Sequence, residues 1–273
     1  MILESTDAKM ITMLKKRIVE IAQKNNLGHI PSCFSSLEIL VTLYTRVVNI
    51  TKVNVKMVDR DRVILSKEHC KLGLVVLLEY LDYIPNNSSE TFLTNGARLG
   101  HDIFKEVIGE DFSALDASFG TLGHGIGVGI GMALANPHNH IYVIVGDGEL
   151  QEGSCWEGLL FIGHNQINNI TIIVDKNNTQ GSDLTKNILD TSSNLASQIS
   201  SFKMDVIECN GHNIEILEKA IKQKVEHPKC IIADTIKGKE CLFVAQENGF
   251  AYLHNHPYTR EQFAKIMENI NNG

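Results

Sequence analysis

The sequence lacks the features that would place this protein on a nucleic acid or in a membrane. Its formal net charge is −7, and no basic stripe is present that could follow a phosphate backbone or an anionic lipid surface. The longest apolar runs, such as 72–78 and 170–174, fall far short of the roughly 20 residues that span a bilayer. Residues 1–22 carry charge throughout, so no signal peptide is visible. We therefore expect a cytoplasmic protein with neither nucleic acid nor membrane among its partners.

The sequence also lacks the cysteine spacing of a zinc site or a disulfide framework. Its six cysteines show no CxxC pair, which predicts reduced, packed thiols. No internal repeat, low-complexity tract or linker rich in proline and glycine interrupts the chain. Because 43% of the 273 residues are hydrophobic, the chain can bury a large core. We predict a single domain over residues 1–273.

Apolar periodicity predicts helices in the first part of the chain and parallel strands in the second. One amphipathic helix follows the N-cap candidates at 5–7 and runs to about Asn25, and a second is predicted after Ser35 and Ser36 through Val48. Residues 85–102 are polar and read as a loop. The remaining predicted elements are strand 62–66, helix 72–83, strand 141–145, helix 154–167, strand 170–174, strand 205–208, helix 213–226 and strand 230–236. The strands are continuous apolar runs, which indicates a doubly wound, mostly parallel sheet with helices on both faces.

Two predicted strands deliver polar residues to the same edge of this sheet. Strand 141–145 is followed by Gly146-Asp147-Gly148, and strand 170–174 is followed by a segment that contains Asn177. Since ligands of open α/β sheets bind beyond the carboxyl ends of the strands, Asp147 and Asn177 should be neighbours in space. A carboxylate, an amide oxygen, a backbone carbonyl and phosphate oxygens form a shell suited to Mg²⁺ or Ca²⁺. A Gly-Asp-Gly on its own is more often a simple turn, but this arrangement predicts a metal-diphosphate anchor.

This arrangement resembles the signature of thiamine diphosphate enzymes. The longer string Gly146-Asp-Gly-Glu-Leu-Gln-Glu-Gly153 is similar to transketolases in particular. Further similar segments cover nearly the whole chain: Leu27-Gly-His29, Asp59-Arg-Asp-Arg62, Ser66-Lys-Glu-His69, Gly100-His101, Ala117–Gly125, Asn210-Gly-His212 and Ala233–Lys239. All of these segments resemble the diphosphate-binding domain. We therefore identify the chain as a member of the transketolase family, corresponding to its N-terminal subunit in a split enzyme.

The resemblance implies a cofactor, a set of site residues and a partner. It implies thiamine diphosphate with Mg²⁺ (or Ca²⁺), and a second chain with the pyrimidine-binding domain that supplies the activating glutamate. The chain would pair with that C-terminal subunit and with a second copy of itself in a heterotetramer that acts on sugars. The implied metal ligands are Asp147, Asn177 and Thr179; the implied cofactor contacts are His69, Gly120, Thr121, Leu122, Gly146, Asp147, Gly148, Glu149 and Asn177; and the implied catalytic residues are His29, His69, His101 and Glu152.

The histidines and glycines also have plainer interpretations. A histidine taken alone is usually a surface or satisfied polar residue, and we assign that role to the histidines at 138, 140, 164 and 227. Either His254 or His256 could belong to the site. The glycines from Gly123 to Gly131 contain a GxGxxG-type match, but no strand directly precedes them, so a dinucleotide site is not expected. Glycines at a spacing of four on an apolar helix indicate close packing instead.

Three functions remain open from the sequence. The first is transfer of a two-carbon ketol unit from a ketose to an aldose by one subunit of a transketolase-like enzyme. The second keeps the cofactor but forms a deoxyketose, and the third is a non-catalytic assembly subunit. Departures from the family pattern, such as Glu68 beside His69 and Asp234 in place of a histidine, point to a specialised sugar substrate. Glu68 either faces the pocket, or it points into solvent or pairs with Lys67 or Lys71.

Overall fold

The computed structural model describes residues 6–100, 103–104, 112–181, 183–190, 193–243 and 257–272. Its strands are β1 (Arg62–Leu65), β2 (Ile103–Phe104), β3 (Ala117–Ser118), β4 (Ile141–Gly146), β5 (Ile170–Lys176), β6 (Thr179–Gln180), β7 (Asp183–Leu184), β8 (Asp205–Asn210) and β9 (Lys229–Asp234). Its α-helices are α1 (Thr6–Asn25), α2 (Ile30–Thr42), α3 (Lys71–Tyr80), α5 (His124–Ala135), α6 (Gly153–Asn165), α7 (Thr185–Ile188), α8 (Leu195–Ser200), α9 (Ile214–Lys222) and α11 (Arg260–Asn272). Short helical turns are η1 (Leu43–Val47), η2 (Glu68–Cys70), η3 (Ser88–Thr91) and η5 (Glu149–Gln151).

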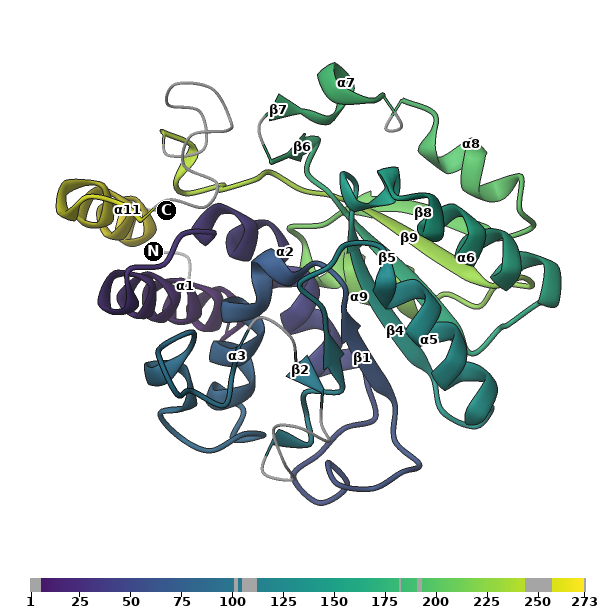
Figure 1. The fold of residues 1–273 in the computed structure, drawn as a ribbon, viewed down its shortest axis with the longest axis horizontal. Helices are drawn as coiled ribbons and strands as arrows, with labels where there is room; N and C mark the ends of the chain where they lie inside the picture. Colours follow the sequence, from purple (N-terminus) through teal and green to yellow (C-terminus); the bar gives the residue numbers. More distant parts are fainter. Residues whose placement is uncertain are drawn as a thin grey trace.

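The strands form one main sheet in the order β2-β3-β1-β4-β5-β9-β8, with helices on both faces (Figure 1). From β3 to β8 all neighbouring strands pair in parallel, and β2 adds an antiparallel edge. The small pair of β6 and β7 lies apart from this sheet. This topology confirms the predicted doubly wound, mostly parallel fold.

Alternate side chains of the central strands divide the interior into two cores. In β4, Val143 and Val145 belong to the core beneath α5, α6 and α8. Tyr142 and Ile144, from the same strand, belong to the core beneath α1, α2, α3 and α9. All six residues of β4 are buried, which explains why its sequence shows no polar alternation.

The second helix begins seven residues before its predicted start after Ser36. α2 starts at Ile30, with Pro31 in its first turn and His29 as its N-cap in the left-handed conformation at φ 64°. The hydroxyls of Ser35 and Ser36 do not cap a helix, because both donate 2.7 Å hydrogen bonds to the buried Asp175 carboxylate. The serines were misinterpreted because their partner lies 139 and 140 residues away.

The helix predicted over 213–226 ends four residues early. α9 closes at Lys222, and Gln223 adopts an extended backbone conformation. The backbone N–H groups of Glu226 and His227 then donate to the Asp205 carboxylate at 2.9 and 2.8 Å. These bonds direct the chain into β9, which the sequence placed one residue late at its start and two residues late at its end.

The glycines of α5 fall into two groups. A Cβ atom at Gly125 would lie 2.3 Å from Ser66 Cβ, and one at Gly129 would lie 2.6 Å from Val143 Cγ2, so these two glycines let the helix approach the sheet closely. Gly127 and Gly131 have no atom of the described residues within 4 Å of the corresponding position. The close packing expected for this helix is therefore confirmed on one side, whereas the other side is open.

A buried ion pair explains the Asp59–Arg62 segment. Asp116 accepts hydrogen bonds from Arg60 at 2.7 and 3.0 Å and from the Val63 backbone at 3.0 Å. Arg60 is 1% exposed, and the pair holds the turn before β3 against β1. The segment therefore serves the sheet rather than the pocket described below.

The C-terminal helix α11 was not predicted from the sequence. It lies beside α1, and its Phe263, Ile266 and Ile270 join the same core as that helix (Figure 1). All six cysteines are free thiols, and only Cys209 is not fully buried, which confirms the expectation of packed thiols. In the described part of the chain, no helix combines the length and apolar character that a membrane crossing requires.

Candidate functional site

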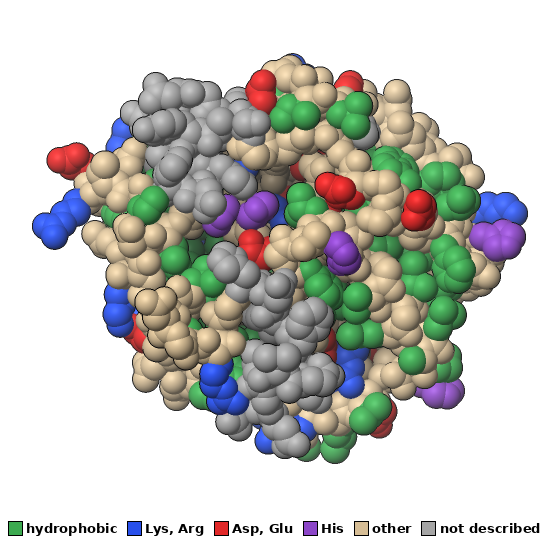
Figure 2. All heavy atoms as spheres, viewed as in Figure 1, with side chains coloured by type: hydrophobic (Ala, Val, Ile, Leu, Met, Phe, Trp, Pro, Cys, Tyr) green, Lys and Arg blue, Asp and Glu red, His purple; other side chains and the backbone are tan. Residues whose placement is uncertain are grey.

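The segments that follow β1, β4, β5 and β9 converge on a pocket of about 350 Å³ at the carboxyl edge of the sheet. Figure 2 shows this face of the molecule, with histidine side chains gathered near a central hollow. The predicted residues that line the pocket are His69, Leu122, Gly146, Asp147, Gly148, Glu149, Glu152, Asn177 and Thr179. Seven lining residues were not predicted as site residues, namely Ser32, Lys67, Gln151, Gln180, Gly181, Ile188 and Lys237.

Asp147 and the segment of Asn177 are joined by direct contacts. One carboxylate oxygen of Asp147 accepts from the Gly148 backbone at 3.0 Å, and the other accepts from the Asn178 backbone at 2.7 Å. Asp147 is 2% exposed, and burial followed by the charge of Asp175 raises its pKa to about 6. A buried carboxylate with a raised pKa is stabilised by a nearby cation. The structure thus brings together the two side chains that the sequence placed at one edge.

Thr179 continues the same turn. Its backbone N–H donates to Asn177 Oδ1 at 3.0 Å, and its hydroxyl donates to the Asn177 carbonyl at 3.2 Å. Gly148 is required here for packing, since a Cβ atom would lie 2.6 Å from Gln180 Cβ on β6. A Cβ atom at Gly146 would meet only ordinary contacts with Lys67. Of the two glycines, Gly148 is therefore the one that lets β6 close over the turn.

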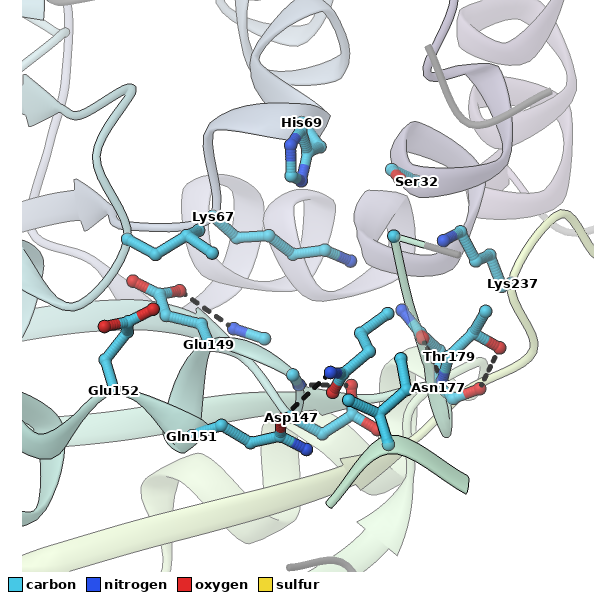
Figure 3. Close-up of a pocket in the computed structure, with 16 residues that line it drawn as sticks. Ser32, Lys67, His69, Asp147, Glu149, Gln151, Glu152, Asn177, Thr179 and Lys237 are labelled. Carbon is cyan, nitrogen blue, oxygen red and sulfur yellow. Dashed lines mark hydrogen bonds between the residues drawn. The ribbon is translucent and has the colours of Figure 1, made fainter. Parts of the chain in front are cut away.

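Two lysines line the pocket, and each comes from a segment that follows a different strand (Figure 3). Lys67, after β1, forms an ion pair with the fully buried Asp175 and donates to the hydroxyls of Ser35 and Ser36 at 3.1 and 3.3 Å. Burial alone would lower the pKa of Lys67, but Asp175 outweighs burial and raises that pKa above its ordinary value. Lys67 therefore remains a fixed positive charge beside the turn after β4.

Lys237, after β9, is the second cation. It is 7% exposed, and burial followed by the charge of Lys67 lowers its pKa to about 8. An anion placed between the two ammonium groups would relieve their repulsion. The pair was not predicted from the sequence, because 170 positions separate the two lysines. In addition, the family resemblance drew attention to the histidine near Lys67 and to the strand before Lys237, and not to the lysines themselves.

The buried carboxylate of Glu149 joins three segments. Its Oε1 accepts from the Gly123 backbone at 3.0 Å and from the Ser66 hydroxyl, and its Oε2 accepts from the Gly146 backbone at 3.1 Å. Burial raises the pKa of Glu149 above its ordinary value. The carboxylate therefore ties the start of α5 to the end of β4, and this structural role accompanies its position in the pocket lining.

Two of the predicted site histidines, His29 and His69, are in contact. The rings of His29 and His69 stack with their centroids 4.7 Å apart, and His69 lines the pocket whereas His29 is not among the lining residues. Burial, followed by the charge of His29, lowers the pKa of His69 to about 3. His69 is therefore a neutral hydrogen-bonding group at physiological pH. The predicted His101 and the candidates His254 and His256 lie outside the described residues.

The segment before α5 contributes one of its three predicted residues. Leu122 lines the pocket, whereas Gly120 and Thr121 are exposed and are not among the lining residues. Glu152 is exposed at the pocket rim, where it is the N-cap residue of α6. A carboxylate oxygen of Glu68 lies 3.6 Å from the Lys71 ammonium group, and Glu68 is not among the lining residues. Of the alternatives given for Glu68, the structure therefore shows the pairing with Lys71.

The donors of the pocket fit a hard cation held together with a diphosphate. Among the described residues, no three His, Cys, Asp or Glu side chains cluster as a metal site. A metal at this turn would therefore take one carboxylate, that of Asp147, together with amide, carbonyl and phosphate oxygens, which suits Mg²⁺ or Ca²⁺. The two buried lysines supply the positive charge that a diphosphate requires.

Comparison with known proteins finds relatives along nearly the whole chain. Residues 6–269 match the family model described as transketolase, thiamine diphosphate binding domain. The chain is 31% identical to an apulose-4-phosphate transketolase subunit from Phocaeicola vulgatus, over 94% of this chain and 90% of that protein. It is 30% identical to a 6-deoxy-6-sulfo-D-fructose transketolase subunit of Clostridium sp., over 94% of each.

A transketolase of known structure has the same fold within a longer chain. The transketolase of Leishmania mexicana superposes on 98% of this chain with a TM-score of 0.81 at 22% identity. This chain spans only 41% of that protein, whereas it spans about nine-tenths of the subunits above.

Proposed function

Because this chain belongs to the transketolase family and comprises its thiamine diphosphate-binding domain, we propose that it is the cofactor-binding subunit of a two-subunit transketolase. Together with a second chain, it transfers a two-carbon ketol unit from a ketose to an aldehyde acceptor. The two similar subunits carry names that refer to a phosphorylated and a sulfonated ketose, which supports an anionic ketose as the substrate class.

One observation carries the cofactor assignment. The turns after β4 and β5 place Asp147, Asn177 and Thr179 in one pocket, which Lys67 and Lys237 also line. In this proposal the side chains of Asp147 and Asn177 and the Thr179 carbonyl hold Mg²⁺ or Ca²⁺, and the lysines bind diphosphate oxygens. Thiamine diphosphate, when bound, supplies the carbanion chemistry that breaks and forms carbon-carbon bonds next to a carbonyl group.

The neutral ring of His69 suits hydrogen bonding to sugar oxygens. Because the pKa of His69 is about 3, its ring donates through one nitrogen and accepts through the other across the physiological range. His29 stacks on that ring and limits its orientation. We propose that His69, His29 and His101 position the substrate and the cofactor.

The second chain would complete the site. Glu152 is exposed at the pocket rim, where it could meet a glutamate of the partner. The nearby helices carry an apolar face: Leu134 of α5 and Leu160 and Phe161 of α6 are 57%, 53% and 45% exposed. Figure 2 shows hydrophobic side chains gathered over these two helices. We propose that this face binds the partner, within a heterotetramer that contains two copies of this chain.

Calorimetry on the purified chain tests the cofactor assignment. We expect thiamine diphosphate to bind in the presence of Mg²⁺ and to lose at least roughly 100-fold in affinity in Asp147→Ala, since this variant loses the charged metal ligand. Asp82→Ala is a matched control, because Asp82 pairs with Lys52 at the surface. Unchanged affinity in Asp147→Ala would refute the assignment.

A further inference from the structure

Lys237 belongs to a short segment whose position depends on backbone hydrogen bonds. Ile236, the residue before it, is 48% exposed, so burial of that side chain does not anchor the segment. The Thr235 backbone instead donates to the Lys176 carbonyl at 3.0 Å, and the Gly238 backbone donates to the Pro31 carbonyl at 3.0 Å. Between these two bonds, the Ile236 backbone donates to the His212 ring at 2.8 Å.

The ring of His212 is held in one tautomer. Because the Ile236 N–H donates to Nε2, that nitrogen must carry the lone pair and Nδ1 must carry the proton. Nδ1 lies 3.2 Å from a carboxylate oxygen of Glu38 on α2, which accepts this proton in a hydrogen bond. Both side chains are 7% exposed, so water competes little with either contact.

Glu38 is suited to this role because it stays ionised. Burial alone would raise its pKa, but the hydrogen bond from His212 and the charge of Lys15 outweigh burial and lower that pKa below its ordinary value. The Lys15 ammonium group lies 3.5 Å from the second oxygen of Glu38. One oxygen of the carboxylate thus faces a cation and the other faces the ring.

The two residues before His212 support its contact with the Ile236 backbone. Asn210 Oδ1 accepts from the His212 backbone at 2.8 Å and fixes the turn after β8. Gly211 packs directly on the segment that follows β9, because a Cβ atom would lie 2.4 Å from Thr235 Cγ2. The Asn-Gly-His string, which the resemblance singled out without a role, therefore forms one support for residues 235–237.

We propose that His212 is a positioning residue for cofactor binding: held by Glu38, it fixes the Ile236 backbone and so sets Lys237 against the diphosphate site. This inference rests on the proposed function, since Lys237 is assigned there to the diphosphate. His212 itself is not among the residues that line the pocket, so it acts through Lys237 and not on the cofactor.

Two variants that differ by one methylene group separate this role from packing. In His212→Gln the amide can reach the place of Nε2 and accept from Ile236, whereas in His212→Asn it reaches only the place of Nδ1, beside Glu38. We expect His212→Asn to weaken binding of thiamine diphosphate with Mg²⁺ by roughly 10-fold in calorimetry on the full chain, the scale on which a supporting partner acts. His212→Gln should retain most of the affinity.

A Lys237→Met background tests whether the effect passes through Lys237. If it does, His212→Asn should cost no further affinity in that background. An equal loss with and without Lys237, or no loss in His212→Asn, would overturn the inference. A wild-type chain that binds no cofactor would instead refute the proposed function, so the two failures differ.

Hydrogen exchange measures the hydrogen bond between the Ile236 amide and His212 without any cofactor. We expect the Ile236 amide to exchange faster in His212→Asn than in the wild type and in His212→Gln, with thermal unfolding confirming that each variant is folded. Equal protection of that amide in all three chains would overturn the inference. If His212→Asn does not fold, His212→Phe removes the same acceptor and takes its place in both measurements.

Discussion

The backbone N–H of Asn178 donates a 2.7 Å hydrogen bond to the carboxylate of Asp147, although 31 positions separate the two residues. The bond forms because β4 and β5 are parallel neighbours, with Gly146 opposite Asp175, so their turns leave the sheet side by side. It fixes the orientation of the Asp147 carboxylate. The turns after β4 and β5 are therefore tied together where they line the pocket.

Asn177→Ala is expected to weaken Mg²⁺-dependent binding of thiamine diphosphate less than Asp147→Ala does. Asn177 would supply a neutral oxygen that water can replace, whereas Asp147 supplies the charge. Calorimetry of both variants in the same Mg²⁺ concentration makes the comparison. A larger loss in Asn177→Ala would contradict the proposed division of roles.

Cofactor affinity is expected to fall as pH rises above about 8. The pKa of Lys237 is lowered to about 8, so the side chain is charged below that pH and loses its attraction for a diphosphate above it. Titrations from pH 7 to pH 9 should show this decline in the wild type. Lys237→Met should bind more weakly at pH 7 and show little further decline, and a parallel decline in both chains would exclude Lys237 as its source.

Two glycines of α5 should respond oppositely to alanine. Gly131→Ala is expected to stabilise the isolated chain by up to about 1 kcal/mol, because alanine favours a helix and the added Cβ atom meets no atom of the described residues within 4 Å. Gly129→Ala should destabilise it, since the Cβ atom would lie 2.6 Å from Val143 Cγ2. Urea unfolding of both variants measures the change in the free energy of unfolding, and equal effects would contradict the packing described for this helix.

The chain purified alone is expected to turn over no ketose and to self-associate modestly. The exposed Leu160 and Phe161 provide an apolar contact, and Leu160→Lys should reduce self-association in sedimentation. Val58→Lys is a control, because Val58 is also exposed but lies in the loop before β1. Turnover by the single chain, without a partner, would refute the two-subunit proposal.

The sequence by itself determined five of the seven strands of the main sheet and the polar residues that follow β4 and β5; the short strands β2 and β3 were not predicted. Continuous apolar runs require strands covered on both faces, and polar residues directly after such strands must emerge together at one edge. This local logic brought Asp147 and Asn177 together correctly. It does not depend on the exact helix boundaries, which were wrong for α2 and α9.

Only the tertiary structure decided which polar side chains contact each other across large separations in the sequence. Ser35 and Ser36 resemble helix caps in sequence, yet their hydroxyls donate hydrogen bonds to Asp175. Lys67, from the segment after β1, forms an ion pair with the same carboxylate. His212 likewise finds Glu38 and Ile236 on two other segments. Such contacts join positions between 24 and 174 residues apart. No local pattern encodes them, because the partner of a buried polar group is set by the packing of the elements that carry it.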